Sequence, residues 1–314
     1  MSDEFVSLVE RGNAARYAND FDAAGAAYEA ALKIAPGNAP VEAALGLLRL
    51  AEGRYAEGWA LYEARKSFQP VIVEQSGIPE WRGESLKGKS LTIWPEQGLG
   101  DEIQMSRYAP VLWAMGAQVV LVCSPLLTDL FRSLKVILAP MENELRLPPT
   151  SYYVRNLSLP ALMGTTLETI PPAPYLQAPT GDKSGGVGFV WRGNPEHPND
   201  AGRSLPSAAV LEPLGKKVKL VDLQDIGGDF LDSAIRIQGL DMVITVDTAM
   251  AHLCGALGVP CWVMLPAERI DWRWMTGRSD SPWYPSLRLF RQTTPGDWDG
   301  VVQQMLAALD EKPD

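Results

Sequence analysis

The sequence is poor in cysteine. Its three cysteines among 314 residues, Cys123, Cys254 and Cys261, stand singly within apolar stretches. This count and this spacing argue against a disulfide-stapled scaffold and against a cysteine-rich zinc site. A reducing compartment is therefore expected.

Long hydrophobic runs and excess positive charge are also missing. The most apolar stretch, residues 109–123, is shorter than the roughly 20 residues that a membrane-spanning helix needs. Lysine and arginine total 28 against 38 aspartates and glutamates, a net charge of −10. Because nucleic acids and anionic membranes are bound through basic faces, neither is an expected partner. The first residues lack the basic start and apolar segment of a secretory signal, so a cytoplasmic protein is predicted.

What the sequence does contain, at its start, is an internal repeat. The period is that of tetratricopeptide repeats, helical hairpins in which small residues let helices approach and aromatic residues fill between them. A single amphipathic hairpin is the alternative. Two repeats are too few to stand alone, so we expect them to pack on the following domain or on another copy of the chain. A shift of 34 residues aligns Gly12 with Gly46, Phe21 with Tyr55, Ala24 with Gly58 and Tyr28 with Tyr62.

Beyond residue 89 the pattern changes to short apolar runs that alternate with helical segments, which predicts an α/β fold. A proline- and glycine-rich stretch over 171–186 divides this part in two. We therefore predict a repeat module over 1–78 and two α/β domains over 79–180 and 181–314. A helix is expected over 102–115, and strands over 90–94, 118–123, 187–191, 218–223, 242–246 and 261–265.

The first candidate site follows the first predicted strand, at the carboxyl end of the sheet, where open α/β folds bind ligands. It consists of Glu96, Gln97, Gly98, Gly100 and Asp101. The glycines allow close approach of a ligand to the backbone. Asp101 has two possible roles, as an N-cap that accepts backbone N–H groups or as a general base for an acceptor hydroxyl. No complete GxGxxG or GK[ST] motif is present, so neither dinucleotide binding nor P-loop chemistry is predicted.

The second candidate site lies where the strand 242–246 delivers a helix built of small residues. Free N–H groups and the positive end of the helix dipole make such a helix start an anion site, suited to a nucleotide diphosphate. The alternative is an ordinary strand–helix unit capped by Asp247 or Thr248. The residues concerned are Asp247, Thr248, Ala249, Ala251 and His252, the last a possible partner of phosphate or ribose.

The third candidate is the polar loop over 191–204, which follows the strand 187–191. Two arginines and one of the two histidines of the chain suit it to grip phosphate and sugar groups. A solvated surface loop is the alternative. The candidate ligands in this loop are Arg192, Asn194, His197 and Arg203.

The segment 271–285 is rich in tryptophan and charge. Its rings can stack on a base or sugar, or pack between the two α/β domains while an arginine pairs with an aspartate, and we favour packing for the tryptophans. Asp297-Trp298-Asp299 matches a DxD metal motif but opens a helix, so Asp297 is expected to act as a cap. Cysteine and histidine never cluster at ligand spacing, and no metal site is predicted.

Together these segments resemble bacterial tetratricopeptide proteins with a carboxyl-terminal domain similar to the family-nine glycosyltransferases, the group of the ADP-heptose:lipopolysaccharide heptosyltransferases. The similarity covers nearly the whole chain. It is carried by 94–101 with Arg107-Tyr108, by 158–160, by 191–204, by 246–248 with 251–253, and by 271–292.

The resemblance implies a GT-B architecture, with the acceptor on the first Rossmann-like half, including Arg107, and the nucleotide sugar on the second. The family's catalytic base falls on Asp101, and its Asp-Thr-Gly-x-x-His donor motif falls on 247–252, with Ala249 in place of glycine. The donor-site lysine of heptosyltransferases has no counterpart here, so Arg203 or Arg192 is expected to replace it.

The expected function is inverting, metal-independent transfer of a sugar from a nucleotide-sugar donor to a protein or glycan acceptor, with no other cofactor. The repeats suggest a protein acceptor or partner and a possible homo-oligomer. Two alternatives remain at this stage: a tetratricopeptide scaffold whose transferase fold has lost its chemistry, and an epimerase that acts on the nucleotide sugar itself.

Overall fold

The computed structural model describes residues 2–142, 145, 147–225 and 227–311. The chain forms two compact units. The helical unit comprises residues 1–78 with two later segments, 158–170 and 268–278, and the α/β unit comprises 79–157, 171–267 and 279–314. The predicted boundary at residue 78 thus coincides with a division between the units, while the boundary near residue 180 stays a prediction.

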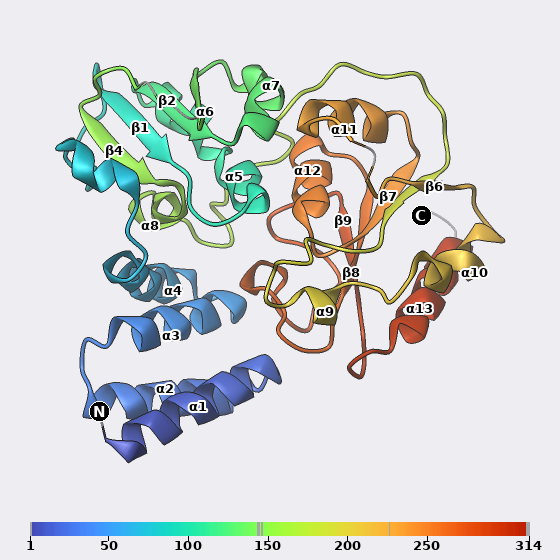
Figure 1. Cartoon of the computed structure of the whole chain (residues 1–314), viewed down its shortest axis with the longest axis horizontal. Helices are drawn as coiled ribbons and strands as arrows, with labels where there is room; N and C mark the ends of the chain where they lie inside the picture. Colours follow the sequence, from blue (N-terminus) through green and yellow to red (C-terminus); the bar gives the residue numbers. More distant parts are fainter. Residues whose placement is uncertain (1, 143–144, 146, 226, 312–314) are drawn as a thin grey trace. The chain divides into compact units, whose positions relative to one another are not determined.

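The helical unit begins with two successive hairpins, drawn in blue in Figure 1. Side chains of Ser2, Asp20 and Asn38 start the first three helices by accepting the backbone N–H three residues on. The α-helices are α1 (Asp3–Tyr17), α2 (Phe21–Ile34), α3 (Ala39–Ala51) and α4 (Tyr55–Tyr62), followed by the 3₁₀ helices η1 (Glu63–Ser67) and η2 (Ile72–Ser76).

Small residues let these helices touch, as the repeat pattern predicts. A Cβ on Gly12 would lie 2.6 Å from the ring of Tyr28, and one on Gly46 would lie 2.6 Å from the backbone nitrogen of Tyr62. The Tyr28 hydroxyl donates to Asn13 Oδ1 at 2.8 Å. The hairpin geometry is therefore as expected, and membership of the tetratricopeptide class stays a prediction.

Two later segments complete the helical unit. Segment 158–170 carries α8 (Leu159–Leu162), and segment 268–278 carries η7 (Trp272–Trp274). The ring of Trp272 meets those of Tyr55 and Trp59 edge-on, at centroid distances of 6.4 and 5.1 Å. We expected Trp272 to pack between the two α/β domains, and this was wrong, because the ring fills an aromatic cluster of the helical unit instead. The expected arginine–aspartate pair is confirmed, with Arg273 bound to Asp271 at 3.0 Å.

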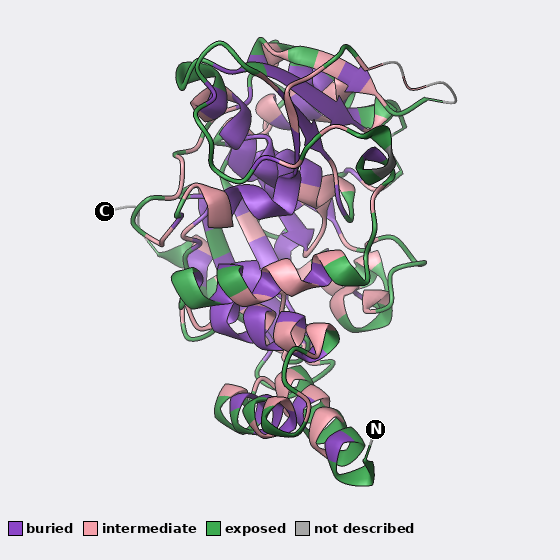
Figure 2. Ribbon diagram, turned by 90° about the vertical axis from the view of Figure 1, so that its left-hand side faces the viewer, coloured by how far each residue is buried: buried purple, intermediate pink, exposed green. Residues whose placement is uncertain are grey.

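The first sheet of the α/β unit is wholly parallel, in the order β3-β2-β1-β4. Three of its strands, β1, β2 and β4, are largely buried, whereas β3 begins at the exposed Ile137; buried residues are purple in Figure 2. The strands are β1 (Ser90–Trp94), β2 (Gln118–Cys123), β3 (Ile137–Pro140) and β4 (Tyr152–Arg155), with α5 (Leu99–Met105), α6 (Tyr108–Ala114), η3 (Pro125–Leu127), α7 (Thr128–Phe131), η4 (Arg132–Leu134) and η5 (Asn156–Ser158).

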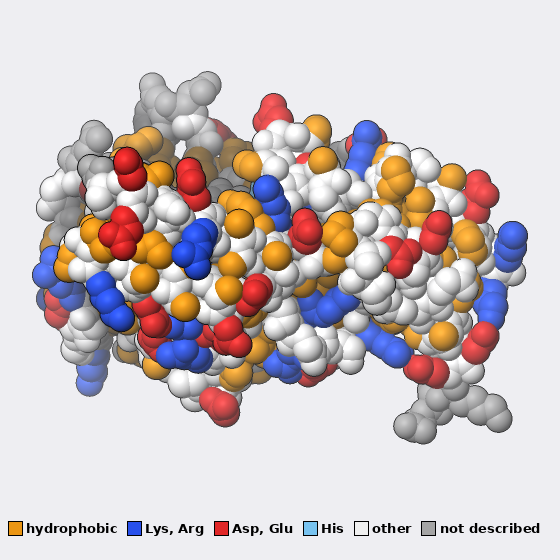
Figure 3. Space-filling model, turned by 90° about the horizontal axis from the view of Figure 1, so that it is seen from below, with side chains coloured by type: hydrophobic (Ala, Val, Ile, Leu, Met, Phe, Trp, Pro, Cys, Tyr) orange, Lys and Arg blue, Asp and Glu red, His pale blue; other side chains and the backbone are white. Residues whose placement is uncertain are grey.

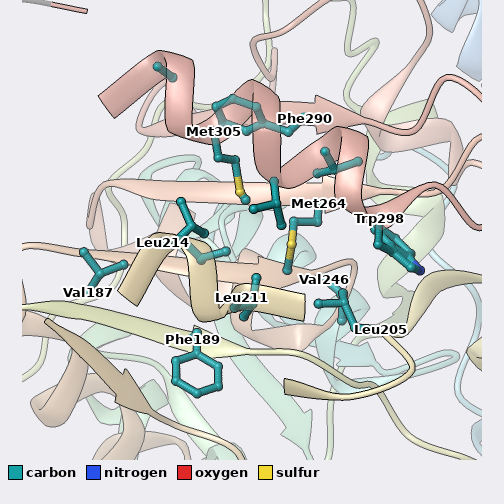
Figure 4. Close-up of a cluster of buried hydrophobic side chains, with 14 residues drawn as sticks. Val187, Phe189, Leu205, Leu211, Leu214, Val246, Met264, Phe290, Trp298 and Met305 are labelled. Atoms are coloured by element: carbon teal, nitrogen blue, oxygen red, sulfur yellow. The ribbon is translucent and has the colours of Figure 1, made fainter. Parts of the chain in front are cut away.

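The second sheet is also wholly parallel, in the order β6-β5-β7-β8-β9. One of its faces packs on α13 and the α10 region through Phe189, Met264 and Met305, among others (Figure 4). The elements are β5 (Val187–Val190), α9 (Asp200–Arg203), η6 (Ala208–Leu211), α10 (Glu212–Gly215), β6 (Leu220–Asp222), α11 (Phe230–Gln238), β7 (Met242–Val246), α12 (Ala249–Leu257), β8 (Cys261–Leu265), β9 (Leu287–Arg291) and α13 (Trp298–Asp310).

The predicted α/β class with parallel sheets is confirmed, and the Asp297 cap is confirmed by its bond from the Gly300 N–H at 2.8 Å. The single helix expected over 102–115 was wrong, because it divides into α5 and α6. The helix breaks here because Pro110 has no N–H group to donate to the carbonyl oxygen of Ser106. At the same point the Ser106 hydroxyl donates to the Ile103 carbonyl oxygen at 2.8 Å.

Candidate functional site

The first two candidate segments come together in the α/β unit. Helix α5 follows β1 and helix α12 follows β7, and the two helices pack side by side (Figure 1). A Cβ on Gly100 would lie 2.8 Å from Cδ2 and 3.3 Å from Nε2 of His252. The missing side chain at Gly100 therefore lets the imidazole rest against the first turn of α5. The two segments are about 150 residues apart in the chain, and they meet at the carboxyl ends of two parallel sheets.

Asp101 lies at the third position of α5, not at the N-cap that the sequence suggested. The N-cap is Gly98, whose backbone N–H donates to Asp101 Oδ2 at 2.9 Å. This is the back-bonding half of a capping box, and it holds the carboxylate at the start of the helix. A capping role is thus present, and it leaves the proposed catalytic role open, because a held carboxylate is also a positioned one.

The other residues of the first segment form a polar corner beside β4. Glu96 is buried and accepts from Arg155 Nη1 at 3.3 Å, while its backbone N–H donates to Asn156 Oδ1 at 3.1 Å. Gln97 is exposed with φ of 61°, a left-handed conformation that turns the chain between β1 and α5. Arg155 and Asn156 were not predicted as site residues, because no strand was predicted over 152–155.

The start of α12 is capped by Thr248 rather than by Asp247. The Thr248 hydroxyl accepts from the Met250 N–H at 3.3 Å and lies 3.1 Å from the hydroxyl of Thr245. Ala249 and Ala251 occupy the first turn with minimal side chains. The two alternatives of a cap and an anion site remain compatible, because one hydroxyl satisfies only one of the N–H groups at a helix start.

The loop after β5 is tied to the start of α12 by Arg203. Its Nη1 donates to the carbonyl oxygen of Asp247 at 2.9 Å, and its Nε faces Asp200 Oδ1 at 3.4 Å. Ser204 closes the loop by accepting from the Gly193 N–H at 2.9 Å and donating to Asp200 at 3.0 Å. The second and third candidate segments are therefore one structural assembly.

The remaining candidates of that loop lie on its outer side. Arg192 is exposed and pairs with Asp225. Asn194 Oδ1 accepts from the Glu196 N–H at 3.0 Å, and His197 Nδ1 accepts from the Asn199 N–H at 3.2 Å, so both side chains shape turns. Their role as donor ligands stays a prediction.

Arg107 is enclosed, with an exposed fraction of 1%. It donates to the carbonyl oxygens of Gln104, Pro171 and Trp283 at 3.0–3.1 Å. Its guanidinium also lies 4.8 Å from the ring centroid of Tyr284. These contacts join α5 to segments beyond residue 170, so the arginine holds the two halves of the α/β unit together.

Glu102 is a buried acid that was not predicted as a site residue. Only 7% of it is exposed, and its Oε2 accepts from the Ser124 N–H at 2.8 Å. Burial raises the pKa of Glu102 to about 7, and the neighbouring Asp101 charge raises it further against the opposing effect of that hydrogen bond. Burial likewise raises the pKa of Cys123 to about 11. The sequence signal that could have indicated Glu102 was its place next to Ile103, at the start of the buried part of α5.

Within the described part of the chain, no three His, Cys, Asp or Glu side chains are grouped as metal ligands would be. None of the helices described there is both long and apolar enough to pass through a membrane. Acidic and basic side chains are interspersed over the face drawn in Figure 3.

The α/β fold with its parallel sheets resembles that of glycosyltransferase structures. A glycosyl transferase of family 9 from Veillonella parvula superposes with a TM-score of 0.50 at 11% identity, covering 73% of this chain and 98% of that one. The iron-containing dodecameric glycosyltransferase TibC from enterotoxigenic E. coli superposes with a TM-score of 0.45 at 13% identity. This superposition covers 73% of this chain and 79% of TibC.

In sequence, the chain is 26% identical to the protein FlbA of Caulobacter vibrioides, and the alignment covers 92% of the present chain. It spans 59% of the length of that relative. No protein-family model matches the chain.

Proposed function

We propose that the chain is an inverting glycosyltransferase of GT-B type that takes a sugar from a nucleotide-sugar donor. The observation that carries this proposal is the packing of Gly100 against His252. It brings a carboxylate at the start of α5 and a helix start on the second sheet to a common edge, and a transfer reaction needs a base and an anion site in such proximity. The shared fold supports the proposal.

The donor diphosphate binds at the start of α12 in this proposal. The positive end of the helix dipole favours negative charge there. Arg203 adds a cation, because its guanidinium already contacts the Asp247 carbonyl oxygen. We assign the role of the missing lysine to Arg203 rather than to Arg192, because only Arg203 is bonded to the α12 start.

The acceptor reacts on the α5 side. Asp101 removes the proton from an acceptor hydroxyl, and the oxygen attacks the anomeric carbon on the face opposite the nucleotide. The bond from that carbon to the diphosphate oxygen breaks, and the diphosphate leaves with the electron pair, stabilised at the α12 start. No step in this scheme uses a metal ion.

The helical unit is proposed to be a tetratricopeptide-type docking element for a protein acceptor. The contacts of Gly12 with Tyr28 and of Gly46 with Tyr62 support the assignment, because they repeat at the same period of 34 residues. We expect the protein to act in the cytoplasm.

The test is calorimetric titration of the full chain with ADP, UDP, GDP and CMP, then transfer assays with sugars on the nucleotide that binds. Asp101→Asn should keep nucleotide binding and lower transfer at least 100-fold, in the range of a lost general base. Asp299→Asn, at an exposed carboxylate in the first turn of α13, is the matched control.

Transfer by Asp101→Asn within threefold of the wild-type rate would show that the base assignment is wrong. Binding of no nucleotide would favour the scaffold function over the transferase. Conversion of the nucleotide sugar without any acceptor would favour an epimerase.

A further inference from the structure

Tyr284 lies against the same face of α12 as His252. It is fully buried, and its hydroxyl oxygen is 3.0 Å from His252 Nδ1. The two rings meet edge-on, with centroids 5.7 Å apart at 73°. A Cβ on Gly255 would lie 2.3 Å from the tyrosine ring, so the glycine one turn after His252 makes the room that the ring occupies. Position and orientation of the tyrosine are thus fixed by packing.

The direction of this hydrogen bond follows from Arg107. Its guanidinium lies 4.8 Å from the centroid of the Tyr284 ring and is itself held by three carbonyl oxygens. A cation beside the ring polarises the phenol, which makes its O–H a better donor and its oxygen a poorer acceptor. The Tyr284 hydroxyl therefore donates and His252 Nδ1 accepts.

We propose that Tyr284 is a positioning residue that fixes the tautomer of His252, with the imidazole proton on Nε2. In a neutral imidazole one nitrogen donates and the other accepts, so an occupied acceptor at Nδ1 puts the proton on the other nitrogen. A Cβ on Gly100, in the first turn of α5, would lie nearest to Cδ2 of His252 and next nearest to Nε2, at 3.3 Å. The ring thus directs an N–H donor toward the place where the two helices meet.

The tautomer bears on nucleotide binding only if the proposed function holds, and on this point the inference rests on that function. An Nε2–H beside the start of α12 is a donor for the diphosphate of a nucleotide sugar that does not need a charged histidine. Arg107 lies beside Tyr284, the partner of the ring. On α5, Asp101 and Glu102 follow Gly100 in the chain, and their carboxylates accept from the Gly98 and Ser124 N–H groups.

The tautomer can be observed directly, because the chain has two histidines, His197 and His252. Long-range ¹H–¹⁵N spectra of the full chain labelled at histidine resolve both rings, and His197→Gln assigns them. At neutral pH we expect His252 with its proton on Nε2 and Nδ1 as a hydrogen-bonded acceptor. A proton on Nδ1 of His252 in the wild type would overturn the inference.

Tyr284→Phe removes the hydroxyl and keeps the ring. We expect the Nδ1 signal of His252 to move away from its hydrogen-bonded position, with His197 unchanged. Tyr175→Phe is the matched control, because its ring lies 4.7 Å from the same guanidinium while its hydroxyl donates to the Ile103 carbonyl at 2.9 Å. An unchanged His252 spectrum in Tyr284→Phe would also contradict the inference.

Tyr284→Phe should weaken binding of the nucleotide identified by calorimetry about five- to tenfold, which corresponds to the free energy of one hydrogen bond. Tyr175→Phe should weaken it less than about twofold. Equal effects of both would assign Tyr284 to packing alone. If the wild type binds no nucleotide, the proposed function fails, while the spectra still decide the tautomer.

Discussion

Arg203 donates from Nη1 to the carbonyl oxygen of Asp247 at 2.9 Å, which joins the loop after β5 to the start of α12. The donated bond leaves the positive charge of the guanidinium beside the N–H groups of the helix. The charge of Arg203 and the helix dipole then act at one place, and each favours an anion.

Replacement of Arg203 by alanine should weaken nucleotide binding about 10- to 100-fold, because a hydrogen bond to a charged group contributes about 1.5–3 kcal/mol. Calorimetric titration measures the change. Arg288→Ala removes an exposed arginine of β9 that pairs with Glu311, and it should leave the affinity within twofold. Equal losses in both variants would point to overall charge rather than to this site.

A methyl group at Gly100 should separate α5 from α12. The Cβ of Gly100→Ala would lie 2.8 Å from His252 Cδ2, and such overpacking costs about 1–3 kcal/mol of unfolding free energy. Gly98→Ala is the control for stability, since its Cβ would meet only Asp101 Oδ2 at 3.6 Å. Urea unfolding compares them, and a Gly100→Ala protein as stable as Gly98→Ala would mean that the helices are not held in contact.

Glu102 should make stability depend on pH. Because burial raises its folded pKa to about 7, its favourable contribution is complete below the unfolded value of 4.5 and is lost as the pH rises through 7. The difference corresponds to about 3 kcal/mol. Glu102→Gln keeps an acceptor for the Ser124 N–H and should remove this loss. Urea unfolding at pH 5 and pH 8 tests it, and an undiminished pH difference in the variant would contradict the assignment.

Trp272 should stabilise the helical unit from a distant part of the sequence. Trp272→Ala removes the edge contacts with Tyr55 and Trp59, and a buried tryptophan of this kind contributes about 3–5 kcal/mol. Hydrogen exchange over α3 and α4 should accelerate in the full chain. Trp113→Ala, at a ring that is 64% exposed, should leave exchange there unchanged. Unaltered protection in Trp272→Ala would show that the hairpins need no later segment.

Local patterns allowed four strands to be predicted to the residue, namely β1, β2, β7 and β8, because each is an apolar run bounded by turn residues. The strands β3, β4 and β9 escaped prediction. The strands β3 and β4 have only four residues each. The strand β9 contains two arginines, Arg288 and Arg291, whereas a buried parallel strand is usually a continuous apolar run.

For the candidate site, the sequence by itself determined which segments follow the strands of parallel sheets, because the chemistry of a strand–turn–helix unit is local. It indicated Asp101, Thr248 and His252, along with the Asp297 cap. Only the tertiary structure decided that Gly100 rests on His252 and that Tyr284 binds its Nδ1, because these contacts join residues distant in the chain. The burial that raises the pKa of Glu102 was decided there too, since desolvation depends on what surrounds a side chain and not on its neighbours in sequence.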